Sequence, residues 1–286
     1  MTVHRIETEF AGRQLSFETG RMAKQASGSA LVRYADTIVL AAVTVSPNIS
    51  TLPFFPLTVE YREKTYAAGK IPGGFLKREG RPSDKEILAS RLIDRSIRPL
   101  FPEGFKNEVQ VFVTVLSADQ ENDADVLGVT AASTALSLSA VPWNGPLAAV
   151  RVGRVDGNWI LNPTFQQLDH SMIDLTVSGS ADSIVMVEGG ALEVSEAEML
   201  EALKVAQRGI QELVGLENQL VAKAPATKLG WKKLPVDDTL VARVRELGEA
   251  AVGKAINAKD KAGRTAAVRA IREQIMTQLA ETYPDG

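Results

Sequence analysis

The sequence of 286 residues contains no cysteine and only two histidines, His4 and His170. Without thiols the chain can form neither disulfides nor zinc–thiolate sites. Two histidines so far apart also argue against imidazole metal sites and against a Ser-His-Asp triad. No apolar run is long enough to span a membrane, and the first residues lack the apolar core of a signal peptide. We therefore expect a cytoplasmic protein with no membrane partner.

Positive charge is scarce overall but concentrated in one segment. The whole chain carries a net charge of −3, whereas residues 62–106 contain eleven Lys or Arg against six Asp or Glu. A basic segment inside an acidic protein can concentrate and steer a phosphate-bearing partner. The 45 % of hydrophobic residues provide enough core for one large domain, or for a large and a small one.

The basic segment includes a helix with well-defined ends. Ser83 and Glu86 form a capping box, which predicts a helix that starts at Asp84. Pro99 disfavours helical geometry in the residue before it, so the helix should end near Arg98.

Three arginines lie on one face of this helix. Arg91, Arg95 and Arg98 follow one another at i, i+4 and i+7, within an arc of roughly 60°. We predict few intrahelical partners for them, since Asp94 is adjacent to Arg95 and adjacent residues do not face each other. Stacked guanidinium groups favour a phosphate or carboxylate ligand. The alternative is a solvated face paired with Glu86, Asp94 and their neighbours.

A glycine-rich loop precedes the helix. Residues 67–74 read AAGKIPGG and are followed by Phe75, Leu76, Lys77 and Arg78. An aromatic ring beside two cations on such a loop can stack on a base of single-stranded nucleic acid while the cations contact the backbone. The alternative is a surface loop whose Phe75 packs into the core. The chain has neither a Walker motif nor a dinucleotide fingerprint.

The rest of the chain mixes strands and helices. Hairpins are predicted to join 31–34 to 38–45 and 147–155 to 159–161, around an Ala-Asp and an Asp-Gly turn. Further strands are expected over 109–116, 173–177 and 184–187, and helices over 128–140 and 195–221. The second of these helices opens with another capping box, formed by Ser195 and Glu198. The alanine- and serine-rich helix at 128–140 should pack closely in the interior. Residues 224–235 indicate a proline-bounded linker, and 237–282 a helical region with a solvated charged face, broken near 257–262.

The segment FFPLTVEYREKTYAAGKIPGGFLKREGRPSDKEILASRLIDRSIRPLFPEGF resembles the first ribonuclease-PH-like domain of the bacterial polynucleotide phosphorylase family. TIVLAAVTVS, NEVQVFVTVLSAD and GPLAAVRVG fit as well, so that the resemblance covers roughly residues 1–220. It implies an α+β ribonuclease-PH-like domain followed by a small all-α domain. It also implies an enzyme that degrades RNA from the 3′ end with inorganic phosphate, reversibly and with Mg²⁺. Members work as homotrimeric rings around single-stranded RNA, and an RNA-degrading multi-enzyme complex is a further expected partner.

The resemblance also implies RNA-binding residues. The family's channel constriction, usually Phe-Phe-Arg-Arg, falls on Phe75, Leu76, Lys77 and Arg78. Leu76 replaces the second phenylalanine of this pattern, so one stacking ring is missing. Lys77 replaces the first arginine and lacks its bidentate guanidinium. Arg91, Arg95 and Arg98 match arginines that the family keeps near the RNA path.

The same comparison implies that this domain is not catalytic. Active domains bind the attacking phosphate at a hydroxyl-rich turn, where this chain has residues 123–129, with Asp123 and Asp125 and no hydroxyl cluster. Asp174 matches one of two metal-binding acids, Leu168 stands where the other would be, and the adjacent Asp169 is one residue out of register. We therefore expect the phosphorolytic centre and its Mg²⁺ in a second domain that this chain lacks.

These observations predict residues 1–222 as the first ribonuclease-PH-like domain, 223–236 as a linker and 237–286 as an incomplete all-helical domain. We expect a piece of a longer protein, without the second catalytic domain and the C-terminal RNA-binding modules. Two functions remain open: a working part of a phosphorolytic exoribonuclease, or a non-catalytic RNA-binding and assembly module. A small-molecule phosphotransferase is disfavoured because no phosphate-cradling loop is present.

Overall fold

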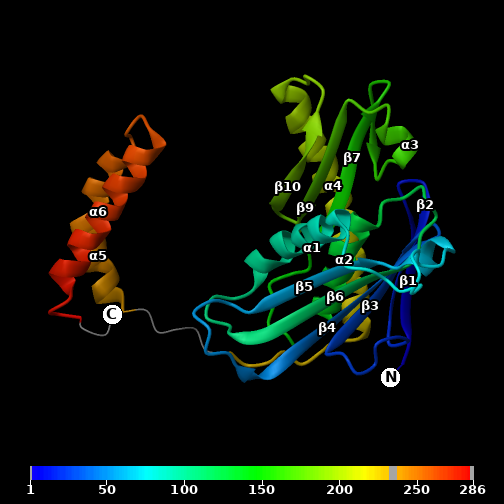
Figure 1. The fold of residues 1–286 in the computed structure, drawn as a ribbon, viewed down its shortest axis with the longest axis horizontal. Helices are drawn as coiled ribbons and strands as arrows, with labels where there is room; N and C mark the ends of the chain where they lie inside the picture. Colours follow the sequence, from blue (N-terminus) through cyan, green and yellow to red (C-terminus); the bar gives the residue numbers. More distant parts are fainter. Residues whose placement is uncertain (1, 232–236, 284–286) are drawn as a thin grey trace. The chain divides into compact units, whose positions relative to one another are not determined.

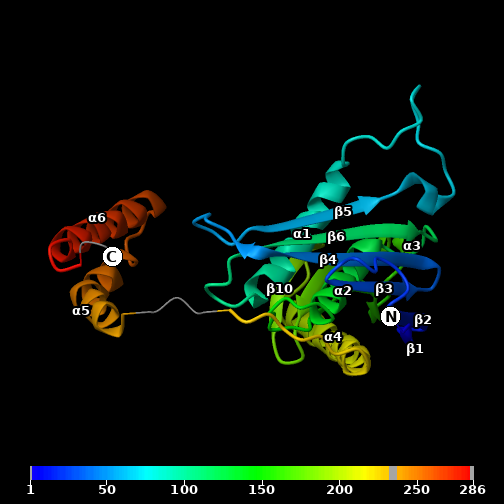
Figure 2. The same ribbon diagram turned by 90° about the horizontal axis from the view of Figure 1, so that it is seen from below.

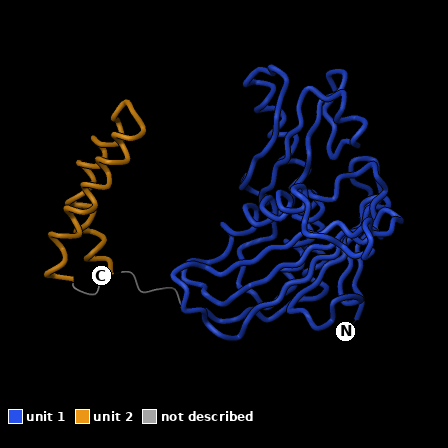
Figure 3. The backbone as a smooth tube through the Cα atoms, in the orientation of Figure 1, with its two compact units in different colours: residues 1–233 blue, residues 234–286 orange. Residues whose placement is uncertain are grey.

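The chain forms two compact units, Met1–Lys233 and Leu234–Gly286 (Figure 1, Figure 3). The structure is a computed structural model that describes residues 2–231 and 237–283. In the described part of the chain, no helix combines the length and the apolar character needed to cross a membrane.

A six-stranded sheet forms one side of the first unit. Its strands lie in the order β1 (His4–Phe10), β2 (Arg13–Thr19), β3 (Gly28–Tyr34), β4 (Thr37–Ile49), β6 (Asn107–Ser117) and β5 (Leu57–Glu63). Only the pairing of β5 with β6 is parallel. Strand β6 shows why one face is core: Val109, Val111, Val113 and Val115 are buried, whereas Phe112 between them is exposed.

A four-stranded antiparallel sheet forms the other side. Its order is β10 (Ile184–Ala191), β9 (Ile173–Gly179), β7 (Ala148–Val155) and β8 (Asn158–Leu161). Both predicted hairpins are confirmed, because β3 pairs with β4 and β7 pairs with β8 in the expected turns. The strands predicted over 109–116, 173–177 and 184–187 are parts of β6, β9 and β10.

Helices α1 (Asp84–Ile97) and α2 (Ala124–Ser137) lie between the two sheets (Figure 1). All residues of α2 are buried, as predicted for this small-residue helix, but it starts four residues earlier than expected. Its N-cap is Asp123, whose extended backbone begins the helix. The close packing is visible at Gly28 of β3, where a Cβ would lie 2.3 Å from the carbonyl oxygen of Ala135. A side chain at Gly28 would therefore displace α2.

Helix α4 (Glu196–Lys223) packs on β7 and β9 of the smaller sheet and on β1 of the larger one. Its predicted capping box is confirmed: Ser195 Oγ accepts from Glu198 N at 3.3 Å, and Glu198 Oε2 accepts from Ser195 N at 2.8 Å. The predicted linker begins where α4 ends. Leu229 N in this segment donates to Ala140 O at 2.7 Å, and residues 232–236, with the predicted Pro235 boundary, lie outside the described residues.

Lys228 fastens this segment to the C-terminal end of α2. Its ammonium donates to Leu136 O, Ser137 O and Ser139 O at 3.2, 2.9 and 2.7 Å. These carbonyls carry the negative end of the helix dipole, so a cation is favoured there. Burial lowers the pKa of Lys228, while the three carbonyl acceptors favour its charged form.

We expect Lys228→Met to lower the free energy of unfolding of the first unit by about 1 kcal/mol, since it removes these bonds and keeps the aliphatic stem. Urea unfolding followed by tryptophan fluorescence measures the change. Lys204→Met, at an exposed lysine of α4, is the matched control and should leave stability unchanged. Equal unfolding midpoints for both variants would show that the three bonds do not stabilise the fold.

The second unit consists of α5 (Asp238–Ala255) and α6 (Lys261–Leu279), which pack against each other. The helical region and its break near residues 257–262 are confirmed. Asp237 and Asp260 cap the two helices with their side chains. An ion pair between Arg269 and Glu273 at 3.0 Å is in keeping with the predicted solvated charged face. Residues 284–286 lie outside the described residues.

Candidate nucleic-acid interface

Helix α1 presents the predicted arginine face. Its capping box is confirmed, with Ser83 Oγ accepting from Glu86 N at 3.3 Å and Glu86 Oε2 accepting from Ser83 N at 2.7 Å. The helix ends at Ile97 and passes into the short 3-10 helix η2 (Arg98–Leu100) at Pro99. Leu92, Ile93 and Ile97 are buried, so the opposite face of α1 is fixed against the core.

The three arginines of α1 differ in their partners. Arg98 forms a two-pronged ion pair with Asp94, at 2.9 and 2.6 Å, and also donates to Phe55 O and Leu57 O. Arg95 pairs with Glu188 of β10 at 2.9 Å and donates to Val187 O. The prediction of few intrahelical partners is therefore wrong for Arg98, because Asp94 lies four residues before it on the same face.

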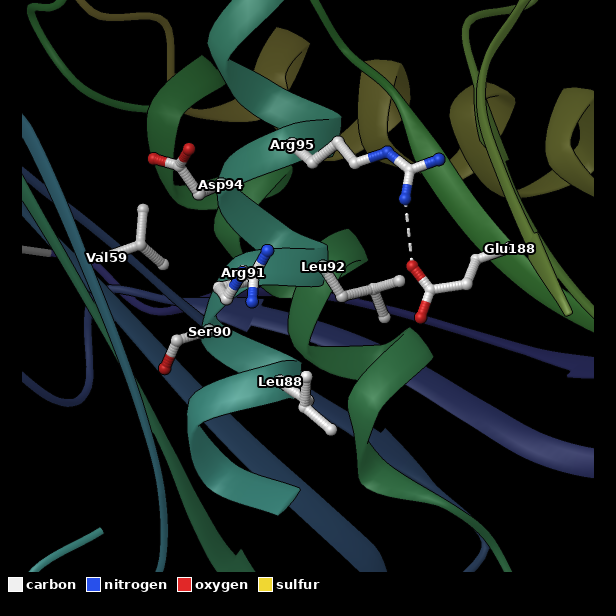
Figure 4. Close-up of a pocket in the computed structure, with 8 residues that line it drawn as sticks. All are labelled: Val59, Leu88, Ser90, Arg91, Leu92, Asp94, Arg95 and Glu188. Carbon is white, nitrogen blue, oxygen red and sulfur yellow. Dashed lines mark hydrogen bonds and ion pairs between the residues drawn. The ribbon is translucent and has the colours of Figure 1, made fainter. Parts of the chain in front are cut away.

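Arg91 is the arginine left open to a ligand. It is exposed and forms no side-chain hydrogen bond or ion pair with a described residue. A groove of about 480 Å³ lies beside it (Figure 4), lined by Val59, Leu88, Ser90, Arg91, Leu92, Asp94, Arg95 and Glu188. In the close-up, Arg95 reaches across to Glu188 while Asp94 points to the other side of the helix. Of the two arginines that line this groove, Arg95 is paired with Glu188, whereas Arg91 has no such partner among the described residues.

The loop between β5 and α1 extends away from the body of the first unit (Figure 2). Phe75 is 98 % exposed and Leu76 is exposed as well, so the alternative that Phe75 packs into the core is wrong. Lys77 has a positive φ of 50°, and Arg78 beside it is exposed. An aromatic ring with two neighbouring cations is thus presented to solvent.

The base of this loop is fixed although its tip is exposed. Thr65, at the start of the 3-10 helix η1 (Thr65–Ala68), donates from its backbone and its hydroxyl to Glu79, at 2.8 and 3.0 Å. Arg62 Nη2 donates to Gly80 O at 3.1 Å. These bonds close the loop across its two ends, so that Phe75 to Arg78 project from a defined base.

A second charged cluster lies at the N-terminal end of α2. Arg151 of β7 donates to Asp123 Oδ2 at 2.8 Å and to Asp125 Oδ2 at 3.1 Å, and its Nε lies 3.2 Å from Asp174 Oδ1. Asp123 and Asp125 are the carboxylates that were predicted to repel phosphate. They do face a shared cleft, but an arginine of the chain itself forms ion pairs with both of them. Arg151 was missed in the sequence, although an arginine within the apolar strand AAVRV signals a buried acidic partner.

Lys85 connects this cluster with α1. Its ammonium lies 3.3 Å from Asp123 Oδ1 and 3.0 Å from Glu63 Oε1. Burial lowers the pKa of Lys85, but the Asp123 and Glu63 carboxylates outweigh it and the net shift is upward. Burial, with the Asp123 charge second, raises the pKa of Asp125 against the opposing effect of Arg151. The cluster is therefore a network of compensated charges.

The remaining predicted residues lie apart from this network or at its edge. Asp174 is half exposed at the end of the Arg151 cluster. Leu168 is the last residue of the short helix α3 (Phe165–Leu168), and Asp169, the residue that follows it, is exposed. Among the described residues, no group of three or more His, Cys, Asp or Glu has the arrangement to hold a metal ion.

Two protein-family models match successive parts of the chain. The model described as 3′ exoribonuclease family, domain 1, matches residues 11–142, and that described as 3′ exoribonuclease family, domain 2, matches residues 145–209. The polyribonucleotide nucleotidyltransferase of Gemmatimonas aurantiaca is 62 % identical over 283 residues, which cover 99 % of this chain and 39 % of that protein. Proteins of the same name from Halalkalibacterium halodurans and Thermus thermophilus are 48 % and 47 % identical, each over 99 % of this chain and 40 % of their own length. The chain thus spans about two fifths of the length of these curated relatives.

Proposed function

The chain belongs to the 3′ exoribonuclease family, whose two models together match more than half of it, and from this membership we propose its function. We propose that it is a portion of a phosphorolytic exoribonuclease that degrades RNA from the 3′ end to nucleoside diphosphates, with inorganic phosphate as co-substrate. In this proposal Phe75 to Arg78 and the arginine face of α1 contact the RNA. The high identity to polyribonucleotide nucleotidyltransferases over nearly the whole chain supports it.

The observation that carries the RNA-contacting role is the presentation of Phe75. A large aromatic side chain that is 98 % exposed contributes no burial free energy to folding, because it stays in water. On a base of RNA the same ring would be covered, and stacking of this kind tolerates any sequence. Lys77 and Arg78 follow at once and can reach the phosphates on either side of that base.

The chemical step is assigned to a part of the enzyme outside this chain. The family implies Mg²⁺, and the acidic cluster of this unit does not fit that ion, because Arg151 already occupies the space between its carboxylates. No catalytic residue is proposed here, and we propose that Mg²⁺ is bound in the remaining three fifths of the full-length enzyme.

Further proposals concern organisation. Residues 1–222 are proposed as the ribonuclease-PH-like domain, 223–236 as a linker and 237–286 as part of an all-helical domain; the two compact units support this division. The homotrimeric ring, the multi-enzyme complex and the cytoplasmic location are proposed from the family resemblance. The second candidate function is a non-catalytic RNA-binding and assembly module, favoured by the Arg151-filled cleft.

Release of ADP from poly(A) by this chain, with phosphate and Mg²⁺, tests whether the chain itself contains a catalytic centre, which neither candidate expects. We expect the chain to bind RNA without releasing ADP. This result supports the proposal that the chain contributes contacts to RNA but not the chemical step. Phosphate-dependent release would show that this chain itself contains a catalytic centre. Absence of both RNA binding and release would contradict the proposal.

We expect Phe75→Ala to weaken binding of single-stranded RNA by about tenfold, from the loss of one stacked base. Fluorescence anisotropy with labelled poly(A) measures the change. Phe54→Ala, at another exposed phenylalanine outside the loop, is the matched control and should bind as the unchanged chain does. An affinity that Phe75→Ala leaves intact would remove the stacking role.

A further inference from the structure

The tip of the loop between β5 and α1, residues 71–78, has no hydrogen bonds of its own. In the part of the chain that the structure describes, the bonds nearest to the tip are made by Lys70, Glu79 and Gly80. Within the tip, Gly74 and Lys77 have positive φ angles of 76° and 50°, so the chain turns around Phe75. The freedom of the tip is therefore limited only by the bonds at the two ends of the loop.

Glu79 makes the bond that lies closest to the tip. Its Oε1 accepts from Thr65 N at 2.8 Å, and its Oε2 accepts from Thr65 Oγ1 at 3.0 Å. Each carboxylate oxygen thus has its own donor, and both donors belong to one residue that lies 14 positions earlier in the chain. Hydrogen bonds to an ionised acceptor are stronger than those between neutral groups. The Glu79–Thr65 pair therefore closes the loop in a defined orientation.

The base of the loop is also attached to the start of α1. Arg62 Nη2 donates to Gly80 O at 3.1 Å, and Arg62 Nε lies 3.4 Å from Glu86 Oε1. Glu86 is buried, accepts from Glu63 N at 2.9 Å and caps α1 through its bond with Ser83 N. These contacts connect the loop base to the fixed N-terminal end of the helix that carries the arginine face.

The charge of Glu79 opposes the binding of a polyanion. The carboxylate follows directly after Lys77 and Arg78 in sequence, and among the described residues its only bonds are those with Thr65. A negative charge at this position lowers the affinity of the tip for phosphate groups by electrostatics alone. A contribution of Glu79 to RNA binding must therefore come from the geometry that it imposes.

We propose that Glu79 is a positioning residue for RNA: its paired bonds with Thr65 restrict the loop before RNA arrives. A loop that is already ordered loses less conformational entropy on binding, and this saving appears as affinity. The inference rests on the RNA contacts proposed above for Phe75, Lys77 and Arg78. It predicts an effect opposite in sign to that of charge, because removal of this carboxylate weakens RNA binding.

RNA affinity of the whole 286-residue chain tests this sign, measured by fluorescence anisotropy with labelled poly(A) at several salt concentrations. We expect Glu79→Ala to bind about fivefold more weakly, since two hydrogen bonds that order the loop are lost. Its salt slope should stay unchanged, because no phosphate contact is removed. Thr65→Val keeps the backbone donor and loses only the hydroxyl, so we expect binding about twofold weaker. Glu60→Ala removes an exposed carboxylate of β5, is the matched control and should bind no more weakly than the unchanged chain.

A spin label on the tip tests the ordering without RNA. The chain contains no cysteine, so Gly73→Cys provides a single attachment point, and a Cβ at Gly73 meets no atom within 4 Å. Addition of Glu79→Ala to this labelled chain is expected to narrow the lines of its electron paramagnetic resonance spectrum, because the tip moves more freely. Loss of charge alone would leave the lines unchanged, and unchanged lines would overturn the positioning role.

A triple variant separates this inference from the proposed function. Replacing Phe75, Lys77 and Arg78 with alanine removes the proposed RNA contacts, and adding Glu79→Ala to it should not weaken binding further, because no contact is left to position. If the triple variant bound RNA as tightly as the unchanged chain, the proposed contacts would be wrong and the inference with them. If the triple variant bound weakly but Glu79→Ala alone bound as tightly as the unchanged chain or more tightly, only the positioning role would be wrong.

Discussion

Glu217→Ala is expected to lower the free energy of unfolding of the first unit by about 3 kcal/mol. Glu217 lies on α4 and is completely buried. Its Oε2 lies 2.6 Å from Ser133 Oγ and 2.9 Å from Thr134 Oγ1 of α2, so it joins α4 to α2. Truncation would leave a cavity and two hydroxyls without this partner.

The hydrogen bonds around Glu217 indicate that its carboxyl group is protonated. Thr134 has a single hydroxyl proton but two oxygens at 2.9 Å, Thr130 O and Glu217 Oε2. A protonated Glu217 can donate to Thr134, which then donates to Thr130. Burial raises the pKa of Glu217 well above its ordinary value, and the Ser133 and Thr134 hydroxyls only partly oppose this. A neutral carboxyl group therefore fits both the geometry and the low polarity of the site.

This protonation predicts how stability depends on pH. The folded-state pKa is raised, so the unfolded chain loses the Glu217 proton at lower pH than the folded chain does. The contribution of Glu217 is therefore fully present below the unfolded-state pKa, and it is lost as pH rises toward the folded-state pKa. Glu217→Gln cannot ionise, and its advantage over glutamate should grow by up to about 1.4 kcal/mol per pH unit within that window.

Tryptophan fluorescence is a suitable probe, because the three tryptophans lie at positions 143, 159 and 231 and none in the helices of the second unit. Urea unfolding at several pH values would compare Glu217→Ala and Glu217→Gln with the unchanged chain. Glu212→Ala, at an exposed position of α4, is the matched control. If glutamine and glutamate gave the same pH dependence, Glu217 would be ionised in the folded state.

Local sequence signals predicted much of this fold. The capping boxes at Ser83 and Ser195 placed the starts of α1 and α4 because both bonds of each box join residues only three apart. The hairpin turns after Tyr34 and Val155 could also be predicted, because residues adjacent in the sequence signal them. The α+β ribonuclease-PH-like fold expected from the resemblance is confirmed by the family matches and by the two sheets. Strands β1, β2 and β5 were not predicted, since their charged residues, such as Glu7 and Glu9 of β1, dilute the apolar pattern.

Long-range contacts account for what the sequence did not reveal in the candidate site. Arg95 meets Glu188, which is 93 residues away, and Arg151 meets acids that lie 23 to 28 residues away in sequence. The helical spacing showed that the arginines share one face of the helix, but it could not show which residues they pair with. The error at Arg98 has a different cause, because its i−4 residue Asp94 was visible in the sequence and was set aside as a neighbour of Arg95.

The free cations of the candidate interface should dominate RNA affinity. Replacing Lys77, Arg78 and Arg91 together with alanine is expected to weaken binding of single-stranded RNA by about 100-fold at about 0.1 M salt. For a single strand, each lost phosphate contact makes the negative slope of log affinity against log salt shallower by about 0.7. Three lost contacts therefore correspond to a loss of affinity of about two powers of ten. Arg98→Ala should have a smaller effect, since Asp94 and two carbonyls already hold its guanidinium.

Anisotropy titrations with poly(A) at several salt concentrations measure both the affinity and the slope. The matched control replaces Lys24, Lys204 and Arg208 with alanine, which changes the net charge by the same amount at exposed cations of α4 and of the loop before β3. If both triple variants lost affinity equally, general charge would explain the binding. A lower affinity and a shallower salt slope in the first variant alone would place the phosphates over the loop and α1, because only direct contacts change the number of released counterions.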